Sequence, residues 1–172
     1  LHFPASVTVA ARVTGPYAPD AVPVHRVTGF DPYLPVAGSA SRRGHVALAV
    51  ADDAPQDLNR VLDEWRNVVV YYAAIRSTGS GRVRALPGLR APLVTYALTD
   101  SDLSPLARGL VHLGEVLLAA GAVELFPSIA GGPIVRHRDE LGQWWEDLTR
   151  TRSNRLPVHR TSTTRRGGAR EH

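Results

Sequence analysis

Cysteine, methionine and lysine are all absent from this sequence of 172 residues. Without cysteine the chain can form no disulfide, no thiolate metal site and no cysteine nucleophile. No run of about 18 apolar residues occurs, so we expect no transmembrane helix. The first residues lack the basic stretch and apolar block of a signal peptide. Together these features predict a cytoplasmic location.

The chain begins at Leu1 and contains no methionine. A complete reading frame should start with methionine, so we expect a piece of a longer polypeptide. All 20 basic residues are arginine, which we attribute to GC-rich codons.

Positive charge is concentrated at the C-terminal end. Residues 150–172 contain seven arginines and one acidic residue, whereas residues 1–149 carry a net charge of −2. A domain that binds nucleic acid usually carries its basic residues on the folded surface. We therefore expect no nucleic-acid partner, although the formal net charge of the whole chain is +4.

Short apolar and β-branched stretches alternate with segments rich in glycine and proline, which is typical of a β-rich domain. We predict strands at 6–13, 24–30, 45–51, 68–77, 91–99 and 122–129, and a loop at 31–44. Residues 68–86 read as a β-hairpin with Gly79 and Gly81 at the bend. With helices inserted between groups of strands, this order predicts an α+β domain with a largely antiparallel sheet and helices packed on it.

The clearest helix is predicted at 102–120, where leucines at 103, 106, 110, 113 and 117 repeat at intervals of three and four. Thr99 and Asp102 resemble a capping box, and Gly121 stands where a C-terminal left-handed residue belongs. A second helix is predicted at 52–67, capped by Asp52 or Asp53, and a short one at 138–150.

Most polar residues have a structural explanation. "GSGRVR" and "AGGP" lack the spacing of a dinucleotide-binding turn. The seven histidines show no metal-ligand spacing, so we predict no metal site. His112 is expected on a helix flank and His137 in solvent. The acidic pairs at 52–53, 63–64 and 139–140 read as helix caps or solvated faces rather than acid–base pairs.

Two aromatic pairs are more informative about packing. Tyr71 and Tyr72 are neighbours in a predicted strand, so their side chains point to opposite faces and at most one can line a cavity. Trp144 and Trp145 are expected to be a core residue and a boundary residue.

Five segments, "YYAAIR", "GRVR-LPG", "PLVTY-LT-DL", "LLAAGA" and "LFPSI", follow one another through residues 60–130. In this order they resemble the substrate-binding part of a glucose–methanol–choline (GMC) oxidoreductase, nearest the bacterial branch of cholesterol oxidases and long-chain alcohol oxidases. The resemblance implies an FAD-dependent enzyme that oxidises an alcohol, with a small and apolar alcohol as the expected partner. It also implies that residues 1–150 form the substrate-binding domain, roofing the flavin.

The resemblance continues through "RSNRLPVH" to His159, where the family carries its active-site histidine. It implies that His159 takes the hydroxyl proton while a hydride goes to the flavin. The following residues depart from the family pattern, with Thr163 and Thr164 near an expected cysteine. We expect residues 151–172 to hold part of the catalytic segment and then a disordered arginine-rich tail, as a shifted reading frame would produce.

The flavin-binding domain and the second catalytic His or Asn of the family are not found in the sequence. We therefore expect the isolated chain to be inactive and to bind flavin weakly or not at all. Two alternatives stay open: a stand-alone α+β domain that binds a small apolar ligand or a protein, and, ranked last, a nucleic-acid binder that uses the arginine tail.

Overall fold

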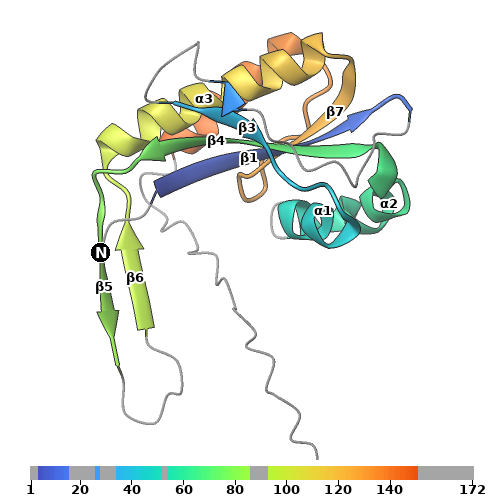
Figure 1. Cartoon of the computed structure of the whole chain (residues 1–172). Coiled ribbons are helices and arrows are strands. Elements are labelled where there is room, and N and C mark those ends of the chain that lie inside the picture. The colour runs from blue at the N-terminus through green and yellow to red at the C-terminus, as the bar shows by residue number, and fades with distance from the viewer. Residues whose placement is uncertain (1–3, 16–25, 28–33, 52–53, 86–92, 151–172) are drawn as a thin grey trace, which may run out of the picture.

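The computed structural model describes residues 4–15, 26–27, 34–51, 54–85 and 93–150. In this part of the chain an antiparallel five-stranded sheet, in the order β2-β3-β4-β1-β7, carries helices on both faces (Figure 1). The predicted α+β class is confirmed. The sheet strands are β1 (Pro4–Val13), β2 (Arg26–Val27), β3 (Val36–Gly38), β4 (Val68–Arg76) and β7 (Ala122–Pro127). The α-helices are α1 (Arg43–Val50), α2 (Leu58–Asp63), α3 (Asp100–Ala119) and α4 (Gly142–Arg150).

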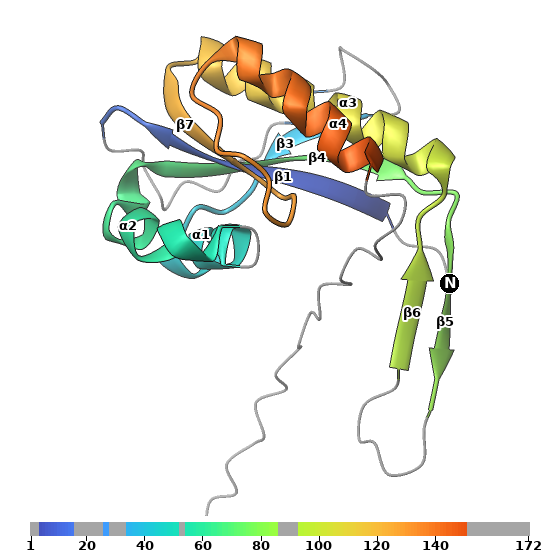
Figure 2. The same ribbon diagram turned by 180° about the vertical axis from the view of Figure 1, so that it is seen from behind.

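One face of the sheet packs under α3 and α4, which lie together above it (Figure 2). The leucine repeat places one stripe of α3 against the sheet, and Leu106, Leu110 and Leu113 are almost completely buried. Fully burying such a side chain contributes about 1.5–3 kcal/mol, so this face holds most of the core. Thr99 and Asp102 form the predicted capping box, and Gly121 has the left-handed φ of 94° that ends the helix.

The opposite face is only partly covered. α1 and α2 pack under the end of the sheet that carries Val68, Val70 and Phe126. The predicted helix at 52–67 is confirmed as α2 flanked by two single turns of 3₁₀-helix, Pro55–Asp57 and Trp65–Asn67. Its expected caps, Asp52 and Asp53, lie outside the described residues.

The prediction of a strand at 45–51 is wrong, because these residues belong to α1. In a strand Val46, Leu48 and Val50 would share one face. Here Val46 and Val50 are fully buried, while Leu48 is 66% exposed. That pattern has the four-residue spacing of a helix. The expected loop at 31–44 likewise contains the short strand β3, which pairs with β4.

The predicted hairpin of residues 68–86 is also wrong. β4 pairs with β1 and β3, while β5 (Ser80–Arg84) leaves the sheet and pairs with β6 (Leu93–Ala97). We call this separate two-stranded unit the β5–β6 arm; it projects from one end of the sheet on the side of α1 and α2 (Figure 1). Gly79 and Gly81 lie where β6 approaches closely rather than at a bend.

Replacing Gly79 by alanine is expected to destabilise the chain by about 1–3 kcal/mol. A Cβ atom at this position would collide with the carbonyl oxygen of Ala97, a backbone atom that cannot rotate away. The matched control is Gly44→Ala in α1, where the new methyl group meets open space and better helix propensity should stabilise by up to about 1 kcal/mol. Urea unfolding of both variants provides the measurement, and equal midpoints would contradict the packing described here.

Candidate functional site

The histidine expected to act as the base, His159, lies outside the described residues, as does the whole of 151–172. The candidate site is therefore built from the sheet that was expected to roof the reaction. The strongest feature there is the part of its underside that α1 and α2 leave uncovered.

Strand alternation decides which side chains reach this underside. On β1, Val7 and Val9 point into the core under α3 and are buried, whereas Ser6 is exposed and Thr8 half-buried on the other face. The neighbouring strand repeats the pattern: the core receives Tyr71, and Tyr72 reaches the underside. The prediction that the two tyrosines point to opposite faces is thus confirmed.

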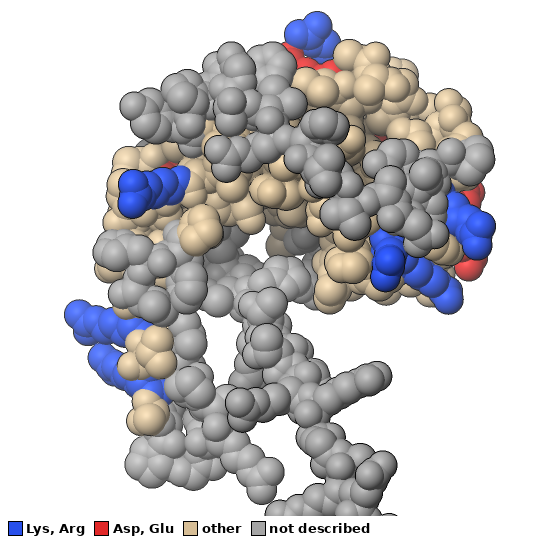
Figure 3. Space-filling view, in the orientation of Figure 1, with Lys and Arg blue, Asp and Glu red and all other residues tan. Residues whose placement is uncertain are grey.

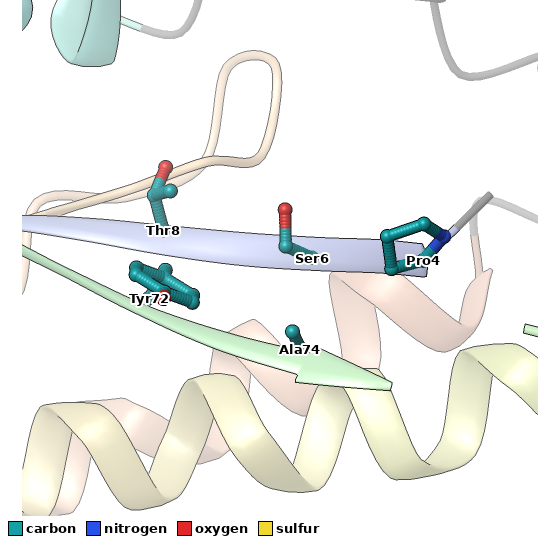
Figure 4. Close-up of a pocket in the computed structure, with 5 residues that line it drawn as sticks. All are labelled: Pro4, Ser6, Thr8, Tyr72 and Ala74. Atoms are coloured by element: carbon teal, nitrogen blue, oxygen red, sulfur yellow. The ribbon is translucent and has the colours of Figure 1, made fainter. Parts of the chain in front are cut away.

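These underside residues line a hollow of about 320 Å³. Its lining consists of Pro4, Ser6, Thr8, Tyr72 and Ala74 (Figure 4). Two small hydroxyl groups and a phenol therefore stand on an otherwise apolar floor, with no charged side chain among these five described residues. In the space-filling view the described surface next to the opening is mostly uncharged, and arginines lie to both sides of it, over β5 and over the helices α1 and α2 (Figure 3).

Backbone pairing fixes the hollow in place. β1 is the central strand of this region and pairs with β4 from Pro4 to Arg12. On its other side, the backbone N–H of Thr8 donates to Oγ of Ser128 at 2.8 Å, and the N–H of Ser128 donates to the carbonyl of Thr8 at 2.9 Å. Residues on a paired, bonded strand keep their orientation, so the floor is preformed.

A buried charge cluster, which sequence reasoning missed, joins the sheet to α2. Glu124 on β7 is 4% exposed and accepts hydrogen bonds from three arginines on different elements: Arg12 at 2.8 Å, Arg60 at 2.8 Å and Arg136 at 2.6 Å. The one signal for it in the sequence is an acidic residue inside the apolar strand "AVELFP". Its partners are far away along the chain, so spacing alone could not identify them.

The low pKa of Glu124 excludes it as a general base. Burial raises its pKa, but the hydrogen bonds from Arg60, Arg12 and Arg136 outweigh that effect and lower the pKa from 4.5 to about 2. A general base works best with a pKa near the operating pH. Glu124 is therefore a structural carboxylate.

Glu124→Gln is expected to remove a stabilisation that depends on pH. The pKa of Glu124 is lower in the folded state than in the unfolded state, so Glu124 stabilises the fold by about 3 kcal/mol above about pH 5. This stabilisation is lost as the pH falls towards 2. Unfolding free energies measured from pH 7 to pH 3 should converge for the two proteins. Glu146→Gln, on an exposed helix pair with Arg150, is the control and should change little. A constant difference across the pH range would contradict this assignment.

A second buried carboxylate, Asp102, holds the base of the β5–β6 arm. Besides capping α3 through the N–H of Thr99 at 2.9 Å, it accepts from Oγ of Ser77 and from the N–H of Thr78, both at 2.8 Å, and from the N–H of Gly79 at 3.1 Å. Burial raises its pKa, but these hydrogen bonds together bring the pKa far below its usual range. Asp102 is thus also unsuited to proton transfer.

Other predicted positions agree with the structure. Trp144 is fully buried and donates its indole N–H to the carbonyl of Pro133, while Trp145 is 39% exposed. His137 is exposed, and His112 is half-buried on α3 beside Glu115.

Among the described residues, no three histidine, aspartate or glutamate side chains gather as a metal site would require. In the same part of the chain, every helix is too short or too polar to cross a bilayer.

Three known proteins are similar to this chain. An uncharacterized GMC-type oxidoreductase of Sinorhizobium fredii is 33% identical over 143 residues, which are 83% of this chain and 28% of that protein. The curated homologues of the chain are GMC-type oxidoreductases. Two GMC-type oxidoreductases from strains of Mycobacterium tuberculosis, also uncharacterized, are 32% identical over 103 residues, or 60% of this chain and 15% of each relative.

These matches show that the chain is similar to part of GMC-type oxidoreductases. The chain spans less than a third of the length of these GMC-type relatives. No protein-family model matches the chain, and no solved structure matches it significantly.

Proposed function

We propose that this chain is the substrate-covering part of an FAD-dependent GMC oxidoreductase that oxidises an alcohol. The observation that carries the proposal is the underside of the sheet, which the described helices cover only in part and whose described lining is uncharged, in a chain whose curated homologues are GMC-type oxidoreductases. An apolar floor with a few hydroxyl groups suits a neutral ligand that is mostly hydrocarbon. It fits the small, apolar alcohol that the resemblance to the cholesterol oxidase branch implies.

The described residues suit a surface that covers the substrate better than a binding site for FAD. A pyrophosphate needs backbone N–H groups at a helix N-terminus after a glycine turn, and the sequence offers no turn of that spacing. Among the described residues, the lining of the hollow contains no arginine to pair with a phosphate. In the proposal, FAD is therefore held by polypeptide outside this segment.

In the proposed reaction, the flavin supplies the acceptor for the hydride. The residues of this chain position the substrate and accept its proton. The underside excludes water and positions the carbon chain of the alcohol, and Ser6, Thr8 and Tyr72 offer hydroxyl groups for orientation. His159 takes the proton of the substrate hydroxyl, because a neutral imidazole with a pKa near about 6.5 can accept it at neutral pH. The support for His159 is the sequence resemblance around "LPVH".

The proposal is tested by comparing this chain with the complete polypeptide that contains it. The complete polypeptide should purify with a flavin absorption band that bleaches when an aliphatic alcohol is added without oxygen. The chain of 172 residues, mixed with FAD, should show no bleaching and weak or no flavin binding. A colourless complete polypeptide, or a tightly bound flavin in the isolated chain, would refute the proposal.

A further inference from the structure

The β5–β6 arm is poorly covered by the rest of the described structure. Arg82 and Arg84 are exposed, and Val83 between them is 52% exposed. Since side chains alternate along a strand, the two arginines stand on one face of the arm and Val83 on the other. An isolated pair of strands is marginally stable in water. Contact with another surface would therefore stabilise the arm.

Its base, by contrast, is firmly held. Asp102 accepts hydrogen bonds from Ser77, Thr78 and Gly79 where the chain enters β5. At the other strand, the hydroxyl of Tyr96 donates to the carbonyl of Gly79 at 3.1 Å. An element that is fixed at its base and exposes the side chains of residues 82–84 is suited to contact another surface.

Charge indicates the kind of surface. Residues 77–99 contain three arginines and no acidic residue, while the rest of residues 1–149 holds ten arginines and fifteen acidic residues. The arm is thus a cationic projection from an acidic body. Complementary surfaces pair opposite charges, so the matching surface presents carboxylates.

The length of the relatives indicates where that surface is. The chain corresponds to 28% of the Sinorhizobium relative, so most of a GMC-type polypeptide lies outside the matched segment. The arm projects on the side of the sheet that carries α1, α2 and the hollow (Figure 1). Under the proposed function, on which this inference rests, that side faces the flavin-binding part.

We propose that the arm inserts into a groove on the flavin-binding part of the same polypeptide. Carboxylates of the groove bind Arg82 and Arg84, and apolar side chains of the groove cover Val83. The arm thereby clamps the roof over the substrate site.

Amide hydrogen exchange of residues 80–84 and 93–97 tests the clamp. These amides should exchange at least about tenfold more slowly in the complete polypeptide than in the chain of 172 residues. The double variant Arg82→Glu/Arg84→Glu, made in the complete polypeptide, should lose that protection. The control is Arg43→Glu, another exposed arginine, on α1, and it should keep the protection.

Three results would overturn the clamp. Equal exchange in both proteins would show that nothing covers the arm. Protection that survives the double charge reversal would remove the role of the arginines. Protection of the isolated chain that grows with its concentration would make a second copy the partner. Flavin absorbance separates the two proposals: a yellow polypeptide with an unprotected arm refutes the clamp alone, and a colourless one refutes the proposed function together with the clamp.

Discussion

Asp102→Ala is expected to lower the unfolding free energy by about 3 kcal/mol or more. The carboxylate is 1% exposed, and its removal takes the acceptor from the N–H groups of Thr78 and Thr99. The N–H of Gly79 would keep only its bond to Oγ of Ser77. A buried donor that loses its partner costs about 1–3 kcal/mol. The loss should therefore exceed that of an ordinary helix cap, which is typically about 1 kcal/mol.

Denaturant unfolding of Asp102→Ala measures the expected loss, with Asp100→Ala as the matched control. Asp100 stands in the same first turn of α3 but is exposed, so its removal should cost less than the removal of the buried Asp102. Hydrogen exchange adds a local readout, because the amides of Thr78 and Gly79 should exchange faster in the Asp102 variant. Equal losses in the two variants would mean that Asp102 is only a cap.

His159→Ala, made in the complete flavin-containing polypeptide, should lower kcat by about 10²–10⁴-fold, the usual contribution of a general base. The proposed proton transfer requires a neutral imidazole. In the unaltered protein, kcat/KM should therefore rise with pH through a pKa near about 6.5. The variant should lose that dependence. Steady-state rates between pH 5 and pH 9 provide both measurements.

Two controls make the histidine prediction specific. His137→Ala removes an exposed imidazole at the N-cap of the 3₁₀ turn Arg138–Leu141 before α4, and it should leave kcat unchanged. Flavin absorbance should be the same in all three proteins, because a loss of cofactor would also lower the rate. A fully loaded His159→Ala protein with normal kcat would refute the role of His159.

Elements with a strong local signal could be predicted from the sequence. α3 combines a leucine repeat, a capping box and a terminal glycine, and all three are present in the structure. β1, β4 and β7 also follow the predicted strands, because β-branched and apolar residues alternate or cluster there. These signals depend only on neighbours along the chain.

Errors arose where distant partners decide the outcome. The run at 45–51 has the composition of a strand, and only its packing under the sheet shows which residues share a face. The turn "TGSG" fits a hairpin, but β4 pairs instead with β1 and β3. A local pattern cannot choose between competing partners for a strand.

In the candidate site, too, features set by local sequence could be predicted and features set by tertiary packing could not. The opposite directions of Tyr71 and Tyr72 follow from strand alternation. That α1 and α2 leave the Tyr72 face partly open depends on tertiary packing, which the sequence pattern does not encode. The three arginine partners of Glu124 come from β1, α2 and the segment after β7, so their convergence could not be predicted either.

The position of β1 between β4 and β7 also affects how the sheet must form during synthesis. The ribosome makes β1 before the other described strands of the sheet, yet its register joins Val9 to Tyr71 on one side and to Pro127 on the other. Contacts between residues so far apart in sequence form slowly. Until β7 is made, one edge of β1 is therefore free to pair with other chains. Chaperones protect nascent chains from such pairing.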